Sequence, residues 1–199
     1  MDKVSYGIGM SLGRDFAAGE VAINADVLAQ GIKDTLAGKT LLTEDEARAT
    51  LMAFQQEMRV KQEAKGRELA EKNKRAGDAF LAENGKKEGV MTLPSGLQYK
   101  ILTVGKGNKP TKSDTVSVHY RGTLVDGTEF DSSYKRGEPA TFPVSGVIPG
   151  WTEALQLMPE GSKWQLYIPA DLAYGERGAG PVIAPTSTLI FEVELLSIK

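Results

Sequence analysis

The chain has 199 residues, and its 24 basic and 26 acidic side chains leave a formal net charge of −2. This length predicts one or two domains, and the hydrophobic content of 41% is enough for a core, while the near balance of charge gives no electrostatic reason to expect nucleic-acid binding. With no cysteine and one histidine, neither thiol chemistry nor a zinc site is expected, and no cofactor is predicted.

Two short helices are predicted at the start of the chain. In the first, residues spaced three and four apart share one face: Tyr6, Met10, Gly13 and Phe16. In the second, Asn24 is a suitable N-cap and Gly38 suits the left-handed position after the C-terminus. The apolar positions of this second helix are Leu28, Ile32 and Leu36.

A longer third helix is predicted from Glu44 to about Ala82, which would make it about 60 Å long at 1.5 Å per residue. Thr43 and Glu46 form a capping box at its start. Its first part carries an apolar seam of Ala47, Leu51, Phe54 and Met58. Its second part is polar on nearly every side, which is typical of a helix that crosses solvent. Two glycines in that part are possible bending points: Gly66 and Gly77.

These helices offer too little apolar surface to bury a core alone. We therefore expect the first two helices and the start of the third to share a core with a second copy of the chain. The alternative is a monomeric cap in which the three helices fold back on themselves.

Beyond the helices the hydrophobic period changes from 3.6 to 2, which indicates strands. Inward positions alternate with polar ones at Val116, Val118 and Tyr120, at Trp164, Leu166 and Ile168, and at Leu189, Phe191, Val193 and Leu195. Asp126–Gly127 and Pro159–Gly161 are turn signals, and Thr152–Leu157 fits a short helix. The predicted fold class is α+β, with an antiparallel sheet wrapped on one short helix.

Several longer strings identify a family resemblance. VHYRGTLVDGTEFDSS, GVIPGW, LAYGERG and TLIFEVELL resemble the FKBP-type peptidyl-prolyl isomerases, over roughly residues 90–199. SYGIGMSLGRDF, QGIKDTLAGK and LTEDEARATLMAFQQEM resemble the helical dimerisation region of the bacterial macrophage infectivity potentiator (Mip) group. The resemblance implies a dimerisation region over 1–42, a connecting helix over 43–84, a linker over 85–95 and an FKBP-type domain over 96–199.

The resemblance also implies a site. Asp131 would orient the bound amide, while the Ile148 N–H and the Tyr174 hydroxyl would donate hydrogen bonds to substrate carbonyls. Trp151 would form the pocket floor, and Arg136 would hold Asp131 in place. Val182 and Ile183 would meet the residue before proline. The walls would be Tyr120, Phe130, Phe142, Val147, Ile148 and Phe191. The loop departs from better-known relatives at Ala179 and Ala184, which affects expected inhibitor affinity and substrate preference more than activity.

Without the resemblance, the same residues have simpler interpretations. An aromatic cluster in a small sheet domain is usually packed core, and an acid such as Asp131 usually caps its own turn. His119 neighbours the inward Tyr120, so it is expected to face the other way and to have no catalytic role. The lysine-rich run over 61–87 is interleaved with acids and indicates a solvated helix face.

The function implied by the resemblance is isomerisation of X-Pro bonds by a V-shaped homodimer with chaperone activity. The implied partners are proline-containing peptides, unfolded proteins, macrolide inhibitors of the FKBP class and a second copy of the chain. The alternative is a chaperone or adhesion-type binding module whose isomerase site is incidental.

No apolar run is long enough to span a membrane, and MDKVSYGIG lacks the regions of a secretory signal. Two interpretations remain, a cytoplasmic protein and a mature envelope protein. LPSGLQYKIL and VIPGWTEALQLMPEGS resemble the envelope-located Mip group, which favours the periplasm or cell envelope.

Overall fold

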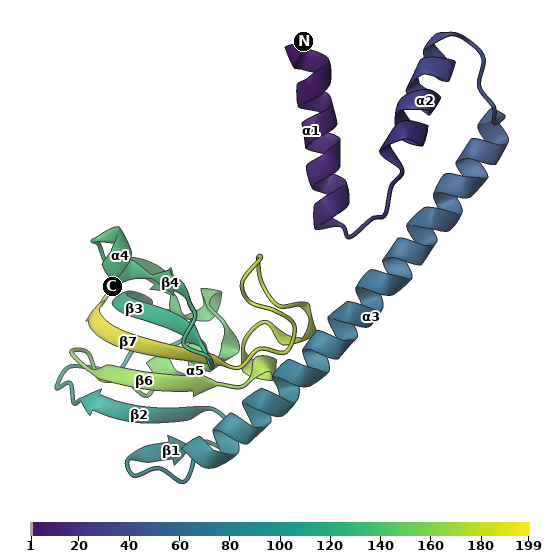
Figure 1. The fold of residues 1–199 in the computed structure, drawn as a ribbon. Coiled ribbons are helices and arrows are strands. Elements are labelled where there is room, and N and C mark those ends of the chain that lie inside the picture. Colours follow the sequence, from purple (N-terminus) through teal and green to yellow (C-terminus); the bar gives the residue numbers. More distant parts are fainter. Residues whose placement is uncertain (1) are drawn as a thin grey trace. The chain divides into compact units, whose positions relative to one another are not determined.

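The computed structural model describes residues 2–199, which form two compact units. The first unit ends at Arg59 and the second runs from Val60 to Lys199. The boundary falls inside one uninterrupted helix, α3 (Glu44–Asn84), which contributes to both units (Figure 1). Within residues 2–199, no helix is long and apolar enough to cross a membrane.

The first two helices begin where the sequence supplies capping groups. α1 (Lys3–Ala18) follows Asp2, whose carboxylate accepts hydrogen bonds from two backbone N–H groups of the first turn. α2 (Ala25–Leu36) follows Asn24, whose side-chain oxygen does the same at 3.0 and 3.1 Å. Gly38, just after α2, has a φ of 66°. The predicted N-cap and left-handed glycine of α2 are therefore confirmed.

The start of α3 is fixed by the predicted capping box. The Thr43 hydroxyl accepts a hydrogen bond from the Glu46 backbone N–H at 3.2 Å, and the Glu46 carboxylate accepts one from the Thr43 N–H at 2.9 Å. This exchange satisfies two donors that the first helical turn leaves unpaired.

The first unit leaves its apolar side chains exposed in the single chain. No residue of α1 or α2 is buried, and Leu51 in the apolar seam of α3 is 60% exposed. Other large apolar side chains of these helices that are exposed include Val4, Tyr6, Ile8, Met10, Val27, Ile32, Leu36, Met52 and Phe54. Apolar surface this extensive is typical of an interaction site.

The second unit is an antiparallel sheet with one helix packed into its core. The strands are β1 (Val90–Thr92), β2 (Gln98–Thr103), β3 (Thr115–Leu124), β4 (Glu129–Ser132), β5 (Ala140–Pro143), β6 (Lys163–Ile168) and β7 (Leu189–Ile198). Their order in the sheet is β1–β2–β6–β7–β3–β4, with β5 paired to β3. The helix α5 (Pro149–Leu155) contributes Trp151, Ala154 and Leu155 to the core (Figure 1). The predicted α+β class is confirmed.

Period-two burial places the core as the sequence predicts. Every predicted inward position of β3, β6 and β7 is buried. The turn over Asp126–Gly127 joins β3 to β4, and the Leu124 N–H donates to the Thr128 carbonyl at 2.8 Å to close it. The ring of Trp164 in β6 stacks on Tyr99 in β2, with centroids 4.4 Å apart.

The structure also differs from the predicted elements in several places. α5 starts at Pro149 rather than Thr152, because the Ile148 carbonyl already accepts the first helical hydrogen bonds. Residues 90–92, expected within a linker, form β1 and pair with β2. Four short helical turns were not predicted: α4 (Ser133–Arg136), η1 (Val144–Gly146), η2 (Ala170–Leu172) and η3 (Gly175–Arg177).

The second part of α3 is not a purely solvated bridge. A stripe of mostly small or polar residues at spacings of three and four is buried or half-buried, and it comprises Gly66, Ala70, Asn73, Gly77, Leu81 and Asn84. At its end the Asn84 amide donates to the Gln98 side chain at 3.0 Å, and Gln98 donates to the Leu81 carbonyl at 2.9 Å. Phe80 packs beside Tyr167 of β6. The last turns of α3 therefore pack against β2 and β6 of the second unit.

Candidate active site

One cavity of about 670 Å³ opens in the second unit. This volume lies within the range of about 300–1,000 Å³ that is usual for small-molecule sites. Its lining includes every predicted site residue except Arg136: Tyr120, Phe130, Asp131, Phe142, Val147, Ile148, Trp151, Tyr174, Val182, Ile183 and Phe191. Residues from β3, β4, β5, α5, β7 and the segment before β7 therefore meet at one place.

Trp151 lies where the aromatic rings of the pocket converge. Its ring centroid is 5.3 Å from Tyr120, 6.0 Å from Phe142 and 5.2 Å from Phe191, each in an edge-to-face arrangement. Such arrangements are the preferred geometry for aromatic pairs. Trp151 is 4% exposed and yet lines the cavity, as expected for a pocket floor.

A glycine in β3 leaves the space that the rings of Phe130 and Phe191 occupy. Gly122 lies opposite Asp131 in β4 and Phe191 in β7. A Cβ atom at Gly122 would lie 2.6 Å from the Phe130 ring and 2.8 Å from the Phe191 ring. These two rings pack edge to face with centroids 5.4 Å apart, so the pocket wall depends on a position without a side chain.

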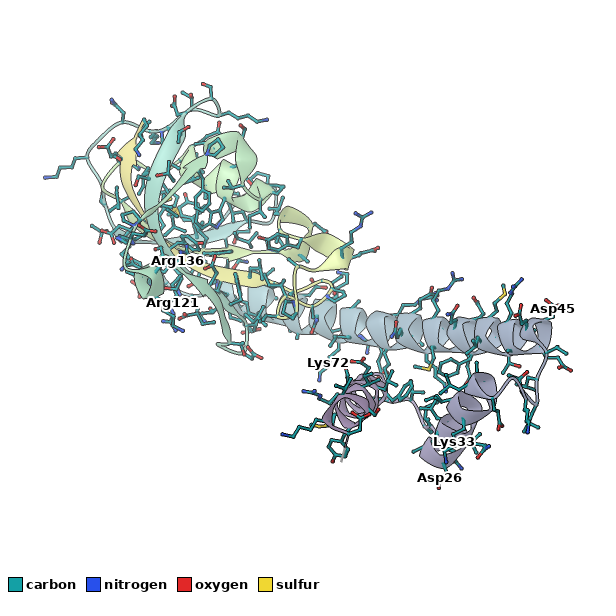
Figure 2. The ribbon with its side chains drawn as sticks, turned by 90° about the horizontal axis from the view of Figure 1, so that it is seen from above. Asp26, Lys33, Asp45, Lys72, Arg121 and Arg136 are labelled. Carbon is teal, nitrogen blue, oxygen red and sulfur yellow. The ribbon has the colours of Figure 1, made fainter. Side chains whose placement is uncertain are left out.

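The polar part of the pocket is a three-residue network. The Tyr120 hydroxyl donates a hydrogen bond to one oxygen of the Asp131 carboxylate, and the Arg136 guanidinium donates to the other oxygen. Arg136 also donates to the Tyr120 hydroxyl at 2.8 Å. Its guanidinium carbon lies 5.4 Å from the Tyr120 ring centroid (Figure 2 labels Arg136). Arg136 itself does not line the cavity, so it acts on the site through Asp131 and Tyr120.

The network fixes the charge of the pocket. Burial raises the pKa of Asp131, but the hydrogen bonds from Tyr120 and Arg136, with the charge of Arg136, outweigh it and bring that pKa below its ordinary value. Burial, followed by the hydrogen bond to Asp131, raises the pKa of Tyr120. At neutral pH the pocket therefore holds a charged carboxylate and a neutral phenol.

Two further donors face the cavity without an internal partner. The N–H of Ile148, just before α5, donates to no group within residues 2–199. Tyr174 is 42% exposed, and its hydroxyl is likewise unpaired within the described residues. Both residues line the cavity, so both donors are available to a bound molecule.

Three lining residues were not predicted, namely Gly146, Gly180 and Pro181, and Ala179 was noted only as a departure in the loop. They contribute backbone and small apolar groups, which leave no side-chain pattern in a sequence. The interpretation of the loop after Tyr174 named Ala179, Val182 and Ile183, but not Gly180 or Pro181. His119 is outside the cavity, since its ring stacks on Tyr134 and its Nδ1 lies 3.0 Å from the Ser133 hydroxyl.

The arrangement favours non-covalent chemistry on an apolar guest. The cavity lining contains no cysteine, serine, lysine or histidine. It combines aromatic walls, one charged carboxylate and unpaired donors at Ile148 and Tyr174. Such a site is suited to enclosing an apolar ring and binding the carbonyl groups on either side of it.

Comparisons with known proteins agree with this geometry. The family described as FKBP-type peptidyl-prolyl cis-trans isomerase matches residues 106–196. The domain amino terminal to FKBP-type peptidyl-prolyl isomerase matches residues 1–101. Outer membrane protein MIP of Legionella longbeachae is 55% identical over 199 residues, which are 100% of this chain and 85% of that protein.

Two other matches extend over nearly the whole chain. Peptidyl-prolyl cis-trans isomerase Mip of Coxiella burnetii is 47% identical, over 100% of this chain and 86% of that protein. The crystal structure of FkpA from Escherichia coli has a TM-score of 0.79 at 43% identity, covering 99% of this chain and 95% of that one. The chain therefore belongs to the FKBP-type peptidyl-prolyl cis-trans isomerases, and it is a Mip-like enzyme of that family.

Proposed function

We propose that the aromatic cavity is where this enzyme isomerises X-Pro bonds, and that it does so by desolvation and shape without a covalent step. The observation that carries the proposal is the convergence of Tyr120, Phe142 and Phe191 on the buried ring of Trp151 at the base of an open cavity. A prolyl ring fits against that base, and the adjoining peptide bond then lies among the pocket walls.

The physical reason lies in the peptide bond itself. Resonance holds the bond planar and sets a rotation barrier of about 18–20 kcal/mol. Twisting the bond removes this resonance, so the transition state is less charge-separated than the planar amide. Water stabilises the planar form more, and an environment without water therefore lowers the barrier. A million-fold acceleration requires about 8 kcal/mol, which is more than one hydrogen bond supplies, so the whole pocket must contribute.

Polar residues of the pocket have separate roles in this proposal. The Ile148 N–H and the Tyr174 hydroxyl bind substrate carbonyls, and Asp131 orients the twisting amide. Arg136 keeps Asp131 charged and in place, which its two hydrogen bonds within the network support. Val182 and Ile183 contact the residue before proline. The remaining lining residues exclude water.

Proline isomerisation assays on a Leu-Pro peptide test this assignment. Asp131→Asn and Tyr174→Phe should lower kcat/KM while leaving the unfolding transition cooperative. His119→Ala is a matched control, because His119 is close to the pocket in sequence but outside it, and this variant should keep full activity. Wild-type rates in both pocket variants would place the site elsewhere, and peptide binding without isomerisation would favour a pure binding module.

We also propose that the chain is a homodimer through residues 1–42 and the start of α3. The support is the exposed apolar surface of the first unit, since no residue of α1 or α2 is buried in one chain. Sedimentation equilibrium should give a dimer mass for the full chain and a monomer mass for residues 60–199. A monomeric full chain would favour the folded-back cap and refute the dimer.

The dimer is proposed to act as a chaperone, because joining two pockets raises the effective concentration of each for one unfolded client. Residues 60–199 are the appropriate fragment for comparison, since a fragment starting at residue 90 would lose the stripe of α3 that packs on the sheet. This fragment should retain peptide isomerisation and lose much of its effect on refolding of a proline-limited protein. Equal refolding activity in fragment and full chain would contradict the proposal.

The cell envelope is the proposed location. The support is that a protein 55% identical to this chain is named as an outer membrane protein. Fractionation of the source cells, with immunodetection of the chain, should place it with the envelope fractions. Recovery with the cytoplasmic fraction would refute this location.

A further inference from the structure

One side of the cavity is formed by a loop that also touches α3. This loop comprises residues 175–188, between Tyr174 and β7, and it contributes Ala179–Ile183 to the lining of the pocket. It lies beside α3 in the ribbon, where it is drawn in yellow-green (Figure 1). All of these residues and the second part of α3 belong to the second compact unit.

The loop is closed on itself by backbone hydrogen bonds. The N–H of Ala179 donates to the Ile183 carbonyl at 2.8 Å, and the N–H of Ile183 returns a bond at 3.1 Å. The N–H of Thr186 donates to the Gly175 carbonyl at 2.9 Å and ties the two ends of the loop together. Because hydrogen bonds close both its tip and its base, the loop is expected to move as a rigid unit. Contacts that fix one end of the loop therefore also fix the position of its tip.

Two hydrogen bonds anchor the end of the loop to α3. The Asn73 amide donates to the Pro185 carbonyl at 2.9 Å. The Thr186 hydroxyl donates to the Ala70 carbonyl. Thr186 has a φ of 53°, a left-handed conformation that is unfavourable for a β-branched residue. Such strain persists only where the surroundings fix the conformation, and the bond to Ala70 is one of the contacts that do so.

A glycine on the same face of α3 lets the loop approach closely. Gly77 is buried, and a Cβ atom there would collide with the Thr188 side chain at the end of the loop. Glycine is markedly less favourable than alanine inside a helix, so its presence at a buried position calls for a packing reason. By contrast, a Cβ atom at Gly66 in the same helix would meet nothing within 4 Å.

We propose that the face of α3 formed by Ala70, Asn73 and Gly77 is a positioning surface for the substrate pocket. It holds the end of loop 175–188 in place, and through that closed loop it sets where Val182 and Ile183 lie. These two side chains would contact the substrate residue that precedes proline, so α3 helps to determine which X-Pro sequences the enzyme prefers. This inference rests on the proposed function of the pocket.

The full-length chain with Gly77→Ala is the first test, and Gly66→Ala is its matched control. Both changes favour the helix, but only the first one pushes on Thr188. We expect the ratio of kcat/KM for Leu-Pro over Ala-Pro peptides to change by about tenfold in Gly77→Ala, since a misplacement of about 1 Å costs up to about a hundredfold. The ratio should stay at the wild-type value in Gly66→Ala. A general loss of folded protein would lower both rates equally and leave the ratio unchanged.

Thr186→Gly is the second test. It removes the hydrogen bond to Ala70, and it also removes the cost of the left-handed conformation, because glycine adopts that conformation without strain. This variant should fold as well as the wild type and still shift the ratio, with faster hydrogen exchange at the Ile183 amide. Arg75→Ala is its control, since Arg75 is exposed on α3 and pairs with Glu71 of the same helix.

The outcomes separate the two proposals. An unchanged ratio in both Gly77→Ala and Thr186→Gly, with an active wild type, would overturn the positioning role alone. Activity in the wild type together with normal rates in the Asp131 and Tyr174 variants would overturn the assignment of the pocket. A shifted ratio in either α3 or loop variant, with both controls unchanged, supports the positioning role.

Discussion

Replacing Gly122 by alanine is expected to deform the aromatic pocket from within the sheet. The added Cβ atom would lie 2.6 Å from two atoms of the Phe130 ring and 2.8 Å from the Phe191 ring. Ordinary contact begins at 3.4 Å, so the Phe130 ring must move by about 0.8 Å (3.4 minus 2.6). Phe191 is 5% exposed and packed against Trp151, so it has little room to give way.

Overpacking of this kind costs about 1–3 kcal/mol. Urea unfolding followed by circular dichroism should show that loss in Gly122→Ala, and a peptide isomerisation assay should show a raised KM because the walls meet the prolyl ring less well. The second change Phe130→Leu shortens the side chain that the Cβ atom meets first. In the Phe130→Leu background, Gly122→Ala should therefore cost less stability than in the wild type.

The double-mutant cycle makes this reasoning testable without relying on activity. If Gly122→Ala leaves the free energy of unfolding within about 0.5 kcal/mol of the wild type and KM unchanged, the rings adapt easily and the pocket wall does not depend on this glycine. If the two substitutions are simply additive, the contact with Phe130 is not the source of the cost.

Three other changes test separate parts of the structure. Asn24→Ala should lower the stability of the full chain by about 1 kcal/mol, measured by thermal unfolding, because it removes the N-cap of α2. Unchanged stability would show that this cap does not contribute. Leu51→Glu should shift sedimentation equilibrium from dimer to monomer, because it puts a charge into the exposed apolar seam; an intact dimer would place the interface elsewhere. The pKa of Asp131 is lower in the folded state, so its contribution to stability is present above the unfolded pKa of about 3.9 and is lost as pH falls through the folded pKa. The difference in unfolding free energy between wild type and Asp131→Asn should therefore be constant from pH 7 to about 5 and shrink in stronger acid, and a difference that grows there would reverse the assigned sign.

Local chemistry made much of the fold predictable. The N-cap at Asn24 and the capping box of Thr43 and Glu46 depend on neighbours within a few residues, and both form as expected. The alternation of β3, β6 and β7 is equally local, since each strand shows its inward face in its own sequence. The pairing order of those strands was not predicted, because no local pattern encodes it.

The contact between α3 and loop 175–188 could not be predicted in this way. The residues on the contacting face are Ala70, Asn73 and Gly77, which carry too little apolar surface to mark a buried stripe. Their partners lie more than 100 residues away, as for Asn73 and Pro185, whose positions differ by 112. A polar composition therefore suggested solvent where small side chains permit close approach.

The pocket shows the same division between side chains and backbone. Its aromatic residues and Asp131 were found through the strings that surround them, and the structure brings them together. Gly146 and Gly180 were missed, since a glycine contributes only main-chain atoms to a wall. The hydrogen bond from Tyr120 to Asp131 was also missed, because the spacing of the two residues does not reveal that β3 and β4 pair in register.

The two tryptophans occupy contrasting environments, which makes the protein its own optical reporter. Trp151 lines the cavity, whereas Trp164 is stacked on Tyr99 and is absent from the cavity lining. A guest entering the cavity should change the emission of the first indole and leave the second as a constant background. Phe in place of Trp164 would then give a single-fluorophore enzyme in which occupancy is read directly, without a labelled peptide.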